Sequence, residues 1–189
     1  MLIDLHRDAV LASVSIACGV RAADLPRPTP CAGWSVADLL AHMTVQHRGF
    51  AAAARGESAS WDPVVATDPV ADYLSAASEV LVAFASARNP LLLPEIGPDP
   101  FPAEQAIGFH FIDYVVHTWD LARALGTSVS FDDTLLEPAL VIAARVPGGE
   151  ARTRPGAAFA PALPSASAGG PLLDRILTLL GRSPNWPDV

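Results

Sequence analysis

The chain has 189 residues, long enough for one domain with a sizeable core and too short for two ordinary ones, so residues 1–189 are expected to form a single domain. Hydrophobic residues make up 51% and charged residues only 17%, a balance that excludes an intrinsically disordered chain. The net charge of -8, with no basic cluster, excludes nucleic acid and anionic membrane as partners, because both require a cationic footprint.

The first part of the chain predicts two helices joined by a connector. Apolar residues recur at helical spacing over residues 1–23, which predicts the first helix. Three prolines in residues 25–33 then require an extended connector, because each proline moves its predecessor out of the helical region. A second helix is expected over Val36–Arg55, because Ser35 and Asp38 have the spacing of a capping box.

A third helix and a second connector follow. Asp68 can cap a helix whose first position is Pro69, and helical spacing continues over residues 70–87. The segment 89–102 is rich in proline and predicts another connector rather than a helix. This connector leads into a long apolar helix.

Residues 101–126 predict that central helix, with about six turns. Pro102 can open it and Gly126 can close it, and most of the other side chains are apolar. Four polar residues nevertheless fall within roughly 80° of one another around the helix: His110, Asp113, His117 and Asp120. Burying titratable groups is costly unless they are paired, hydrogen-bonded or bound to metal, so this stripe predicts a site.

The last third of the chain predicts a helix, a long excursion and a short final helix. Asp132 or Asp133 can cap a helix that reaches residue 144, whereas residues 147–170 are rich in Gly, Pro, Ala and Ser and lack helical spacing. Residues 171–180 have an apolar helical face. Helices joined by proline-rich loops, without strand patterns or repeats, predict an all-α bundle whose sites are built from facing helices.

The polar stripe offers two ligands for a metal ion. Asp113 and His117 lie four residues apart, which places them one above the other, about 5–6 Å apart at Cβ. A catalytic zinc site needs three protein ligands and an open position, so a third ligand must come from another helix. His42 is the better candidate, because it lies two turns inside the second helix among apolar neighbours, whereas His47 is next to Arg48 and nearer the frayed end.

The same residues also fit a simpler interpretation. A carboxylate and a histidine four residues apart are typical of a buried ion pair, and a core histidine such as His42 is usually hydrogen-bonded. His110 and Asp120 are expected to support the ligands, His110 also as a proton shuttle and Asp120 alternatively as the partner of an arginine. Cys31 is expected to be a buried, unreactive thiol, and Trp34 a core or staple residue.

Three separated blocks carry a family resemblance. They are PTPCAGWSVADLLAHM at Pro28–Met43, DYVVHTWDLARALG at Asp113–Gly126 and LLDRILTLLGRSPNW at Leu172–Trp186. In sequence, order and separation they resemble the family built on the N-terminal domain of mycothiol-dependent maleylpyruvate isomerase, within the DinB/YfiT-like metal-binding superfamily. The last block resembles stand-alone, actinobacterial-type members with a GR-x-P-x-W tail.

The resemblance implies an all-α, DinB-like four-helix bundle, with an extra short helix and a long C-terminal excursion. It implies a divalent metal bound through His42, Asp113 and His117, with zinc as the expected ion and nickel or another divalent metal as the alternative. Related members use the metal to activate a low-molecular-weight thiol, so a transferase or isomerase that uses mycothiol on a small electrophile is expected. The alternatives are a metal-dependent hydrolase, or a non-catalytic metal-binding or dimerisation protein with a structural or empty site.

Two features depart from the isomerase. The acidic ligand is Asp113 rather than the longer glutamate, which draws a metal closer to the helix. The isomerase has a second, C-terminal domain that contributes to its active site, and this chain ends about where that domain would begin. The isomerase reaction itself is therefore not carried over from the resemblance.

The sequence also predicts a cytoplasmic protein. Its first residues lack a cationic segment before an apolar core, and its two cysteines are too few for a disulfide framework. Its apolar runs are shorter than the roughly 18 residues that a membrane span requires. The expected partners are a small-molecule substrate and a low-molecular-weight thiol, and a homodimer is left open.

Overall fold

The computed structural model describes residues 1–87, 89–153, 157–164 and 170–187. Contacts divide the chain into two compact units, Met1–Val129 and Ser130–Val189. A single domain over the whole chain therefore stays a prediction. Within the described ranges the backbone forms two isolated bridges and no strand. Across the same ranges, no helix combines the length and the apolar character that crossing a membrane would take.

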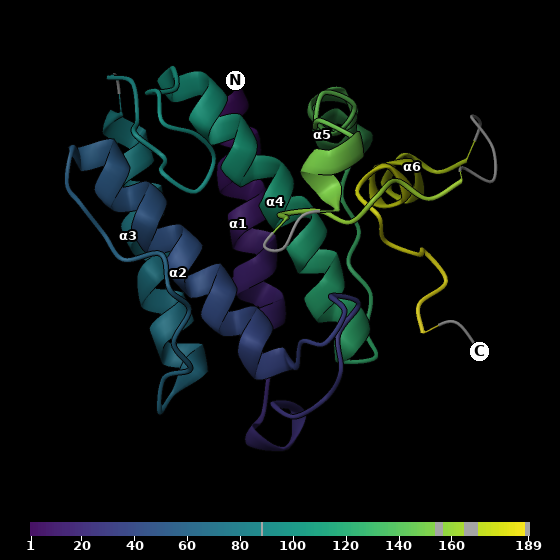
Figure 1. Ribbon diagram of the computed structural model, residues 1–189. Helices are drawn as coiled ribbons and strands as arrows, with labels where there is room; N and C mark the ends of the chain where they lie inside the picture. The colour runs from purple at the N-terminus through teal and green to yellow at the C-terminus, as the bar shows by residue number, and fades with distance from the viewer. Residues whose placement is uncertain (88, 154–156, 165–169, 188–189) are drawn as a thin grey trace. The chain divides into compact units, whose positions relative to one another are not determined.

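In its described residues, the first unit is a bundle of four helices (Figure 1). They are α1 (Leu2–Ala17), α2 (Val36–Arg55), α3 (Pro69–Ser86) and α4 (Ala103–Ala124). α2 packs most extensively against α3, α1 packs most extensively against α4, and α2 also contacts α4. This arrangement confirms the predicted all-α, DinB-like four-helix bundle.

Local signals fix where α2 begins and ends. The hydroxyl of Ser35 accepts from the N–H of Asp38 at 3.3 Å, and the carboxylate of Asp38 accepts from the N–H of Ser35 at 2.9 Å. This is the predicted capping box. Gly56 ends the helix with φ of 74°, in the left-handed region that favours glycine. The position of His42 along α2 is therefore set by signals close to it in the sequence.

The cap yields a first prediction. Ser35→Ala should lower the free energy of unfolding by about 1 kcal/mol, because an N–H in the first turn of α2 loses its acceptor. Urea denaturation followed by circular dichroism measures this difference. Ser58→Ala, at an exposed serine in the loop after α2, is the matched control and should unfold like wild type. Equal stability of the two variants would contradict a role for the cap.

α1 is shorter than the helix predicted over residues 1–23. It ends at Ala17, and a separate 3₁₀ turn follows at Ala22–Asp24. The apolar spacing continues past Gly19, but glycine is a poor helix residue, and the chain leaves the helix just before it. The other helices begin and end within two residues of the predicted positions.

An apolar cluster packs between the second half of α2, the end of α3, the connector after α3 and the start of α4. Its largest side chains are Phe50, Phe84, Leu91, Leu93 and Ile107. The connector between these helices is held by paired backbone hydrogen bonds of 2.8 Å between Leu91 and Phe101. The cluster anchors the first turns of α4, the helix that carries the polar stripe.

The second unit contains α5 (Asp133–Ala143) and α6 (Leu172–Leu179), which pack against each other. α6 buries Ile176, which lies on its predicted apolar face, and also the neighbouring Leu177. Between these helices lies the predicted excursion over residues 147–170, in which the structure describes a 3₁₀ turn at Gly149–Arg152. Residues 154–156 and 165–169 of the excursion lie outside the described residues.

Arg152 connects separate parts of the second unit. Its side chain is buried, and its guanidinium donates to the backbone carbonyl oxygens of Val146, Pro147, Ala160 and Leu179. The bond to Pro147 is 2.7 Å long and the bond to Val146 is 3.0 Å long. One side chain thus satisfies backbone acceptors after α5, in the excursion and at the end of α6, where the loops provide few regular backbone partners.

Candidate metal centre

The structure brings together the three residues that the sequence predicts as ligands. His42 on α2 and Asp113 and His117 on α4 each offer a ligand atom, and these atoms lie within 4.8 Å of one another. Nε2 of His117 is 3.3 Å from Oδ1 of Asp113. The rings of His42 and His117 meet edge to face, with their centroids 5.1 Å apart. Two imidazoles and a carboxylate are a donor set that zinc binds, so these residues fit a divalent cation.

Asp120 determines how the ring of His117 is oriented. Its Oδ2 is 2.9 Å from Nδ1 of His117, so that nitrogen faces Asp120 while Nε2 faces Asp113. Burial alone would lower the pKa of His117, but the charge of Asp113 and the hydrogen bonds that the imidazole makes with Asp113, Asp120 and Cys31 raise it well above its usual value. The surroundings therefore stabilise a positive charge on this imidazole, and a bound cation can take the place of the proton.

Cys31 belongs to this neighbourhood, which the sequence interpretation did not foresee. Its burial agrees with the prediction, but its Sγ lies 3.2 Å from Oδ2 of Asp120 and 3.9 Å from Nδ1 of His117. These three residues form a second group whose ligand atoms lie close enough to hold an ion. The available sequence signal was the position of Cys31 in the same family-like block as His42, but spacing does not show which way a connector side chain points.

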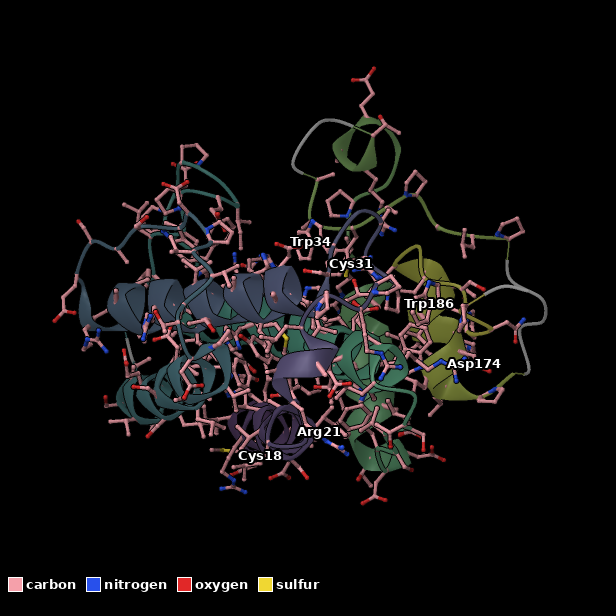
Figure 2. All side chains as sticks on the ribbon, turned by 90° about the horizontal axis from the view of Figure 1, so that it is seen from below. Cys18, Arg21, Cys31, Trp34, Asp174 and Trp186 are labelled. Atoms are coloured by element: carbon pink, nitrogen blue, oxygen red, sulfur yellow. The ribbon has the colours of Figure 1, made fainter. Side chains whose placement is uncertain are left out.

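A turn in the connector before α2 fixes Cys31 and Trp34, which lie close together in Figure 2. The N–H of Trp34 donates to the carbonyl of Cys31, and the N–H of Thr29 donates to the carbonyl of Trp34, both at 3.0 Å. The hydroxyl of Thr29 also accepts from the N–H of Cys31 at 3.2 Å. Gly33 has φ of 79°, so the turn requires a residue that tolerates the left-handed region.

Trp34 lies against the ligand set. Its ring centroid is 4.8 Å from that of His42 and 6.4 Å from that of His117, where the two rings are nearly parallel. Trp34 was predicted as a core or staple residue, and it also contacts two of the predicted metal ligands. The indole shields one side of both imidazoles from water, which strengthens electrostatic interactions at that side of the set.

A second polar cluster crosses the same bundle and joins three of its helices. Nε2 of His6 is 2.9 Å from Nδ1 of His110, and Nε2 of His110 is 3.2 Å from Nδ1 of His47. We call this series, from α1 through α4 to α2, the three-histidine chain. Tyr114 stacks on His47 and His110 at centroid distances of 4.1 and 4.2 Å, and it donates its hydroxyl hydrogen to the carbonyl of Met43.

The three-histidine chain corrects the expectation for His47 and shows where His110 lies. His47 is fully buried rather than near a frayed end, because α2 stays packed beyond it through Phe50 and Ala52. Both ring nitrogens of His110 face other histidines, so its support of the metal ligands stays a prediction. Burial lowers the pKa of His6 to about 3 and holds the pKa values of His47 and His110 well below their usual range, which keeps all three rings neutral.

The two clusters differ in their access to solvent. The side chain of Asp113 keeps 19% of its surface exposed and His42 is half-buried, so small molecules can approach the ligand set. His6, His47 and His110 are 0–1% exposed. The ligand set is therefore partly open to solvent, whereas the three-histidine chain is part of the interior.

Comparisons with known proteins point to one family. The family described as the mycothiol maleylpyruvate isomerase N-terminal domain matches residues 7–122, a stretch that contains the ligand set and Asp120. Two uncharacterized proteins, from two strains of Mycobacterium tuberculosis, are each 30% identical to this chain over 179 residues. Each alignment covers 94% of this chain and 96% of the relative.

Solved structures show a similar fold. The crystal structure of the mycothiol-dependent maleylpyruvate isomerase superposes with a TM-score of 0.58 at 15% identity, and that of a histidine-to-alanine mutant with a TM-score of 0.61 at 14% identity. Both superpositions cover 76% of this chain and 66% of the isomerase chain. At these identities the likeness concerns the fold and not the activity.

Proposed function

Because the chain belongs to the mycothiol maleylpyruvate isomerase N-terminal domain family, we propose that it binds a divalent cation, zinc in the first place, and acts with mycothiol on a small electrophile. The cation is assigned to His42, Asp113 and His117. The observation that carries the proposal is that these three ligand atoms lie within 4.8 Å of one another in a chain of this family. Mycothiol comes from the names of the family and of the similar solved structures.

A bound divalent cation would lower the pKa of a coordinated thiol or water and so supply a nucleophile at neutral pH. Three protein ligands leave a position for that group. Asp113 contributes the negative charge that attracts the cation, and Asp120 keeps Nε2 of His117 turned toward the set. Trp34 shields the two imidazoles on one side, and Asp113 is partly exposed, which would let a thiol and an electrophile approach the cation.

Metal content is the first test of this proposal. Protein purified without chelators should carry about one divalent cation per chain. His42→Ala and Asp113→Asn should lose it, with a drop in affinity at least as large as the 10- to 100-fold that outer hydrogen-bond partners typically contribute. Asp62→Asn, at an exposed aspartate in the loop after α2, is the matched control and should bind like wild type. Wild type without metal would contradict the proposal and favour a non-catalytic protein with an empty site.

Dependence on the thiol separates the enzymatic alternatives. Turnover of a panel of small electrophiles should require both the cation and added mycothiol. His42→Ala should abolish this turnover, while circular dichroism confirms that the variant is folded. A rate that is indifferent to mycothiol but lost with the cation would favour a hydrolase that uses water.

A further inference from the structure

Cys31, Asp120 and His117 form a buried series of hydrogen bonds adjoining the ligand set. The thiol of Cys31 donates to Oδ2 of Asp120 at 3.2 Å, and Nδ1 of His117 is 2.9 Å from the same oxygen. A carboxylate only accepts hydrogen bonds, so both neighbours are donors and they converge on one atom. All three side chains are less than 9% exposed, so water does not compete freely for these bonds.

We propose that Cys31 is a positioning residue for the cation site. Its thiol holds the carboxylate of Asp120 against Nδ1 of His117, and this contact keeps Nε2 turned toward Asp113 and the ligand set. Outer partners of this kind orient a ligating imidazole and tune its affinity for metal. The inference rests on the proposed function, because the direction of Nε2 matters to function only if His117 binds the cation.

The backbone around Cys31 supports this role. The carbonyl of Cys31 accepts from the N–H of Trp34 and from the hydroxyl of Thr29, and its N–H donates to the same hydroxyl. The thiol therefore projects from a fixed turn rather than from a free loop. A donor fixed in this way restricts the positions that the carboxylate of Asp120 can adopt.

Direct ligation of a cation by Cys31 is the competing interpretation, since Sγ, Nδ1 of His117 and an oxygen of Asp120 could hold one. The ligand set already uses Nε2 of His117. A second cation on Nδ1 would require an imidazole that has lost both of its protons, and it would displace the 2.9 Å bond to Asp120. If Nδ1 of His117 donates to Asp120 and the thiol of Cys31 donates to the same carboxylate, both hydrogen bonds are kept.

The test is the affinity for Zn²⁺, measured by competition with a chromophoric chelator. Cys31→Ala should weaken binding about tenfold, at the lower end of the range for outer partners. Cys31→Ser keeps a donor and should recover most of the affinity. In an Asp120→Ala background, Cys31→Ala should have no further effect, because its influence passes through that carboxylate. Cys18→Ala, at the exposed cysteine, is the matched control and should bind like wild type.

Four results would overturn the inference. An equal loss from Cys31→Ala in both backgrounds would mean that the thiol acts through packing and not through Asp120. A much larger loss for Cd²⁺ than for Zn²⁺ would make Cys31 a direct ligand, because thiolate favours the softer ion. Wild-type affinity in Cys31→Ala would remove the role while leaving the proposed function intact. If wild type bound neither ion, both the proposed function and this inference would fail.

Discussion

Lowering the pH from 6.5 to 4.5 should destabilise the metal-free protein steeply, by up to about 4 kcal/mol per pH unit, if three histidines take up protons on unfolding. Burial lowers the pKa of His6 to about 3 and holds those of His47 and His110 well below the usual value. The unfolded chain binds protons at these residues near pH 6.5, whereas the folded chain does not. Because the unfolded state binds more protons throughout this window, stability falls as the pH falls.

Other titrating groups act outside this window. The pKa of His117 is raised, so its contribution is fully present below pH 6.5 and is lost only as the pH rises through its folded value. The pKa values of Asp4, Asp24 and Asp38 are lowered, and stability from these carboxylates is lost below about pH 4. Near the three-histidine chain, burial raises the pKa values of Tyr73 and Tyr114, so both side chains stay neutral in acid. Burial lowers the pKa of His47 by more than the negative charge of Asp113 raises it.

Urea denaturation at a series of pH values, in the presence of a chelator, measures this dependence without a contribution from metal release. His6→Gln replaces one titrating ring with a neutral side chain that can still hydrogen-bond. Between pH 6.5 and 4.5, the change in the free energy of unfolding per pH unit should then be smaller by about 1.4 kcal/mol, which is the contribution of one proton. Stability that does not change over this interval would contradict neutral, buried rings in the three-histidine chain.

Arg152→Met should destabilise the second unit by about 3 kcal/mol or more, because hydrogen bonds from a charged donor to buried acceptors are among the more costly to remove. Methionine keeps most of the apolar stem but none of the donors. The carbonyl oxygens that lose their donor are those of Val146, Pro147, Ala160 and Leu179. Loss of these hydrogen bonds should loosen the loop after α5, the excursion and the end of α6 together.

Hydrogen exchange with mass spectrometry localises this effect. Peptides from residues 130–189 should lose protection in Arg152→Met, while α1 to α4 keep theirs. Arg145→Met, at an exposed arginine of the same unit, is the matched control and should exchange like wild type. Unchanged protection in Arg152→Met, or a uniform loss along the whole chain, would contradict a local role for this arginine.

The features that the sequence predicted well depend on residues close to one another in the chain. α2 begins and ends where predicted because Ser35, Asp38 and Gly56 act within one turn of its ends. Asp113 and His117 share a face because helical spacing places them there, and capped α2 carries His42 to a depth where it can meet them.

The features that were missed depend on side chains from distant parts of the chain. Cys31 and Asp120 are 89 positions apart, and His6 and His110 are 104 positions apart. Spacing within one helix does not show how two helices are rotated against each other, so it could not pair these residues. His47 was expected near a frayed end because the sequence does not show that other helices pack against the last turns of α2. The role of Arg152 was not foreseen because one of its acceptors, Leu179, lies 27 positions away.

The three-histidine chain also has a consequence for the uniqueness of the fold. Apolar helices can slide past one another by a turn with little change in buried area, but the paired nitrogens of His6, His110 and His47 meet in one alignment of α1, α4 and α2. A shifted alignment would leave several imidazole nitrogens buried without partners, in place of the two at the ends of the series. The hydrogen bonds between the histidines therefore favour one alignment of α1, α4 and α2. In a shifted alignment, His42 on α2 and His117 on α4 would not meet.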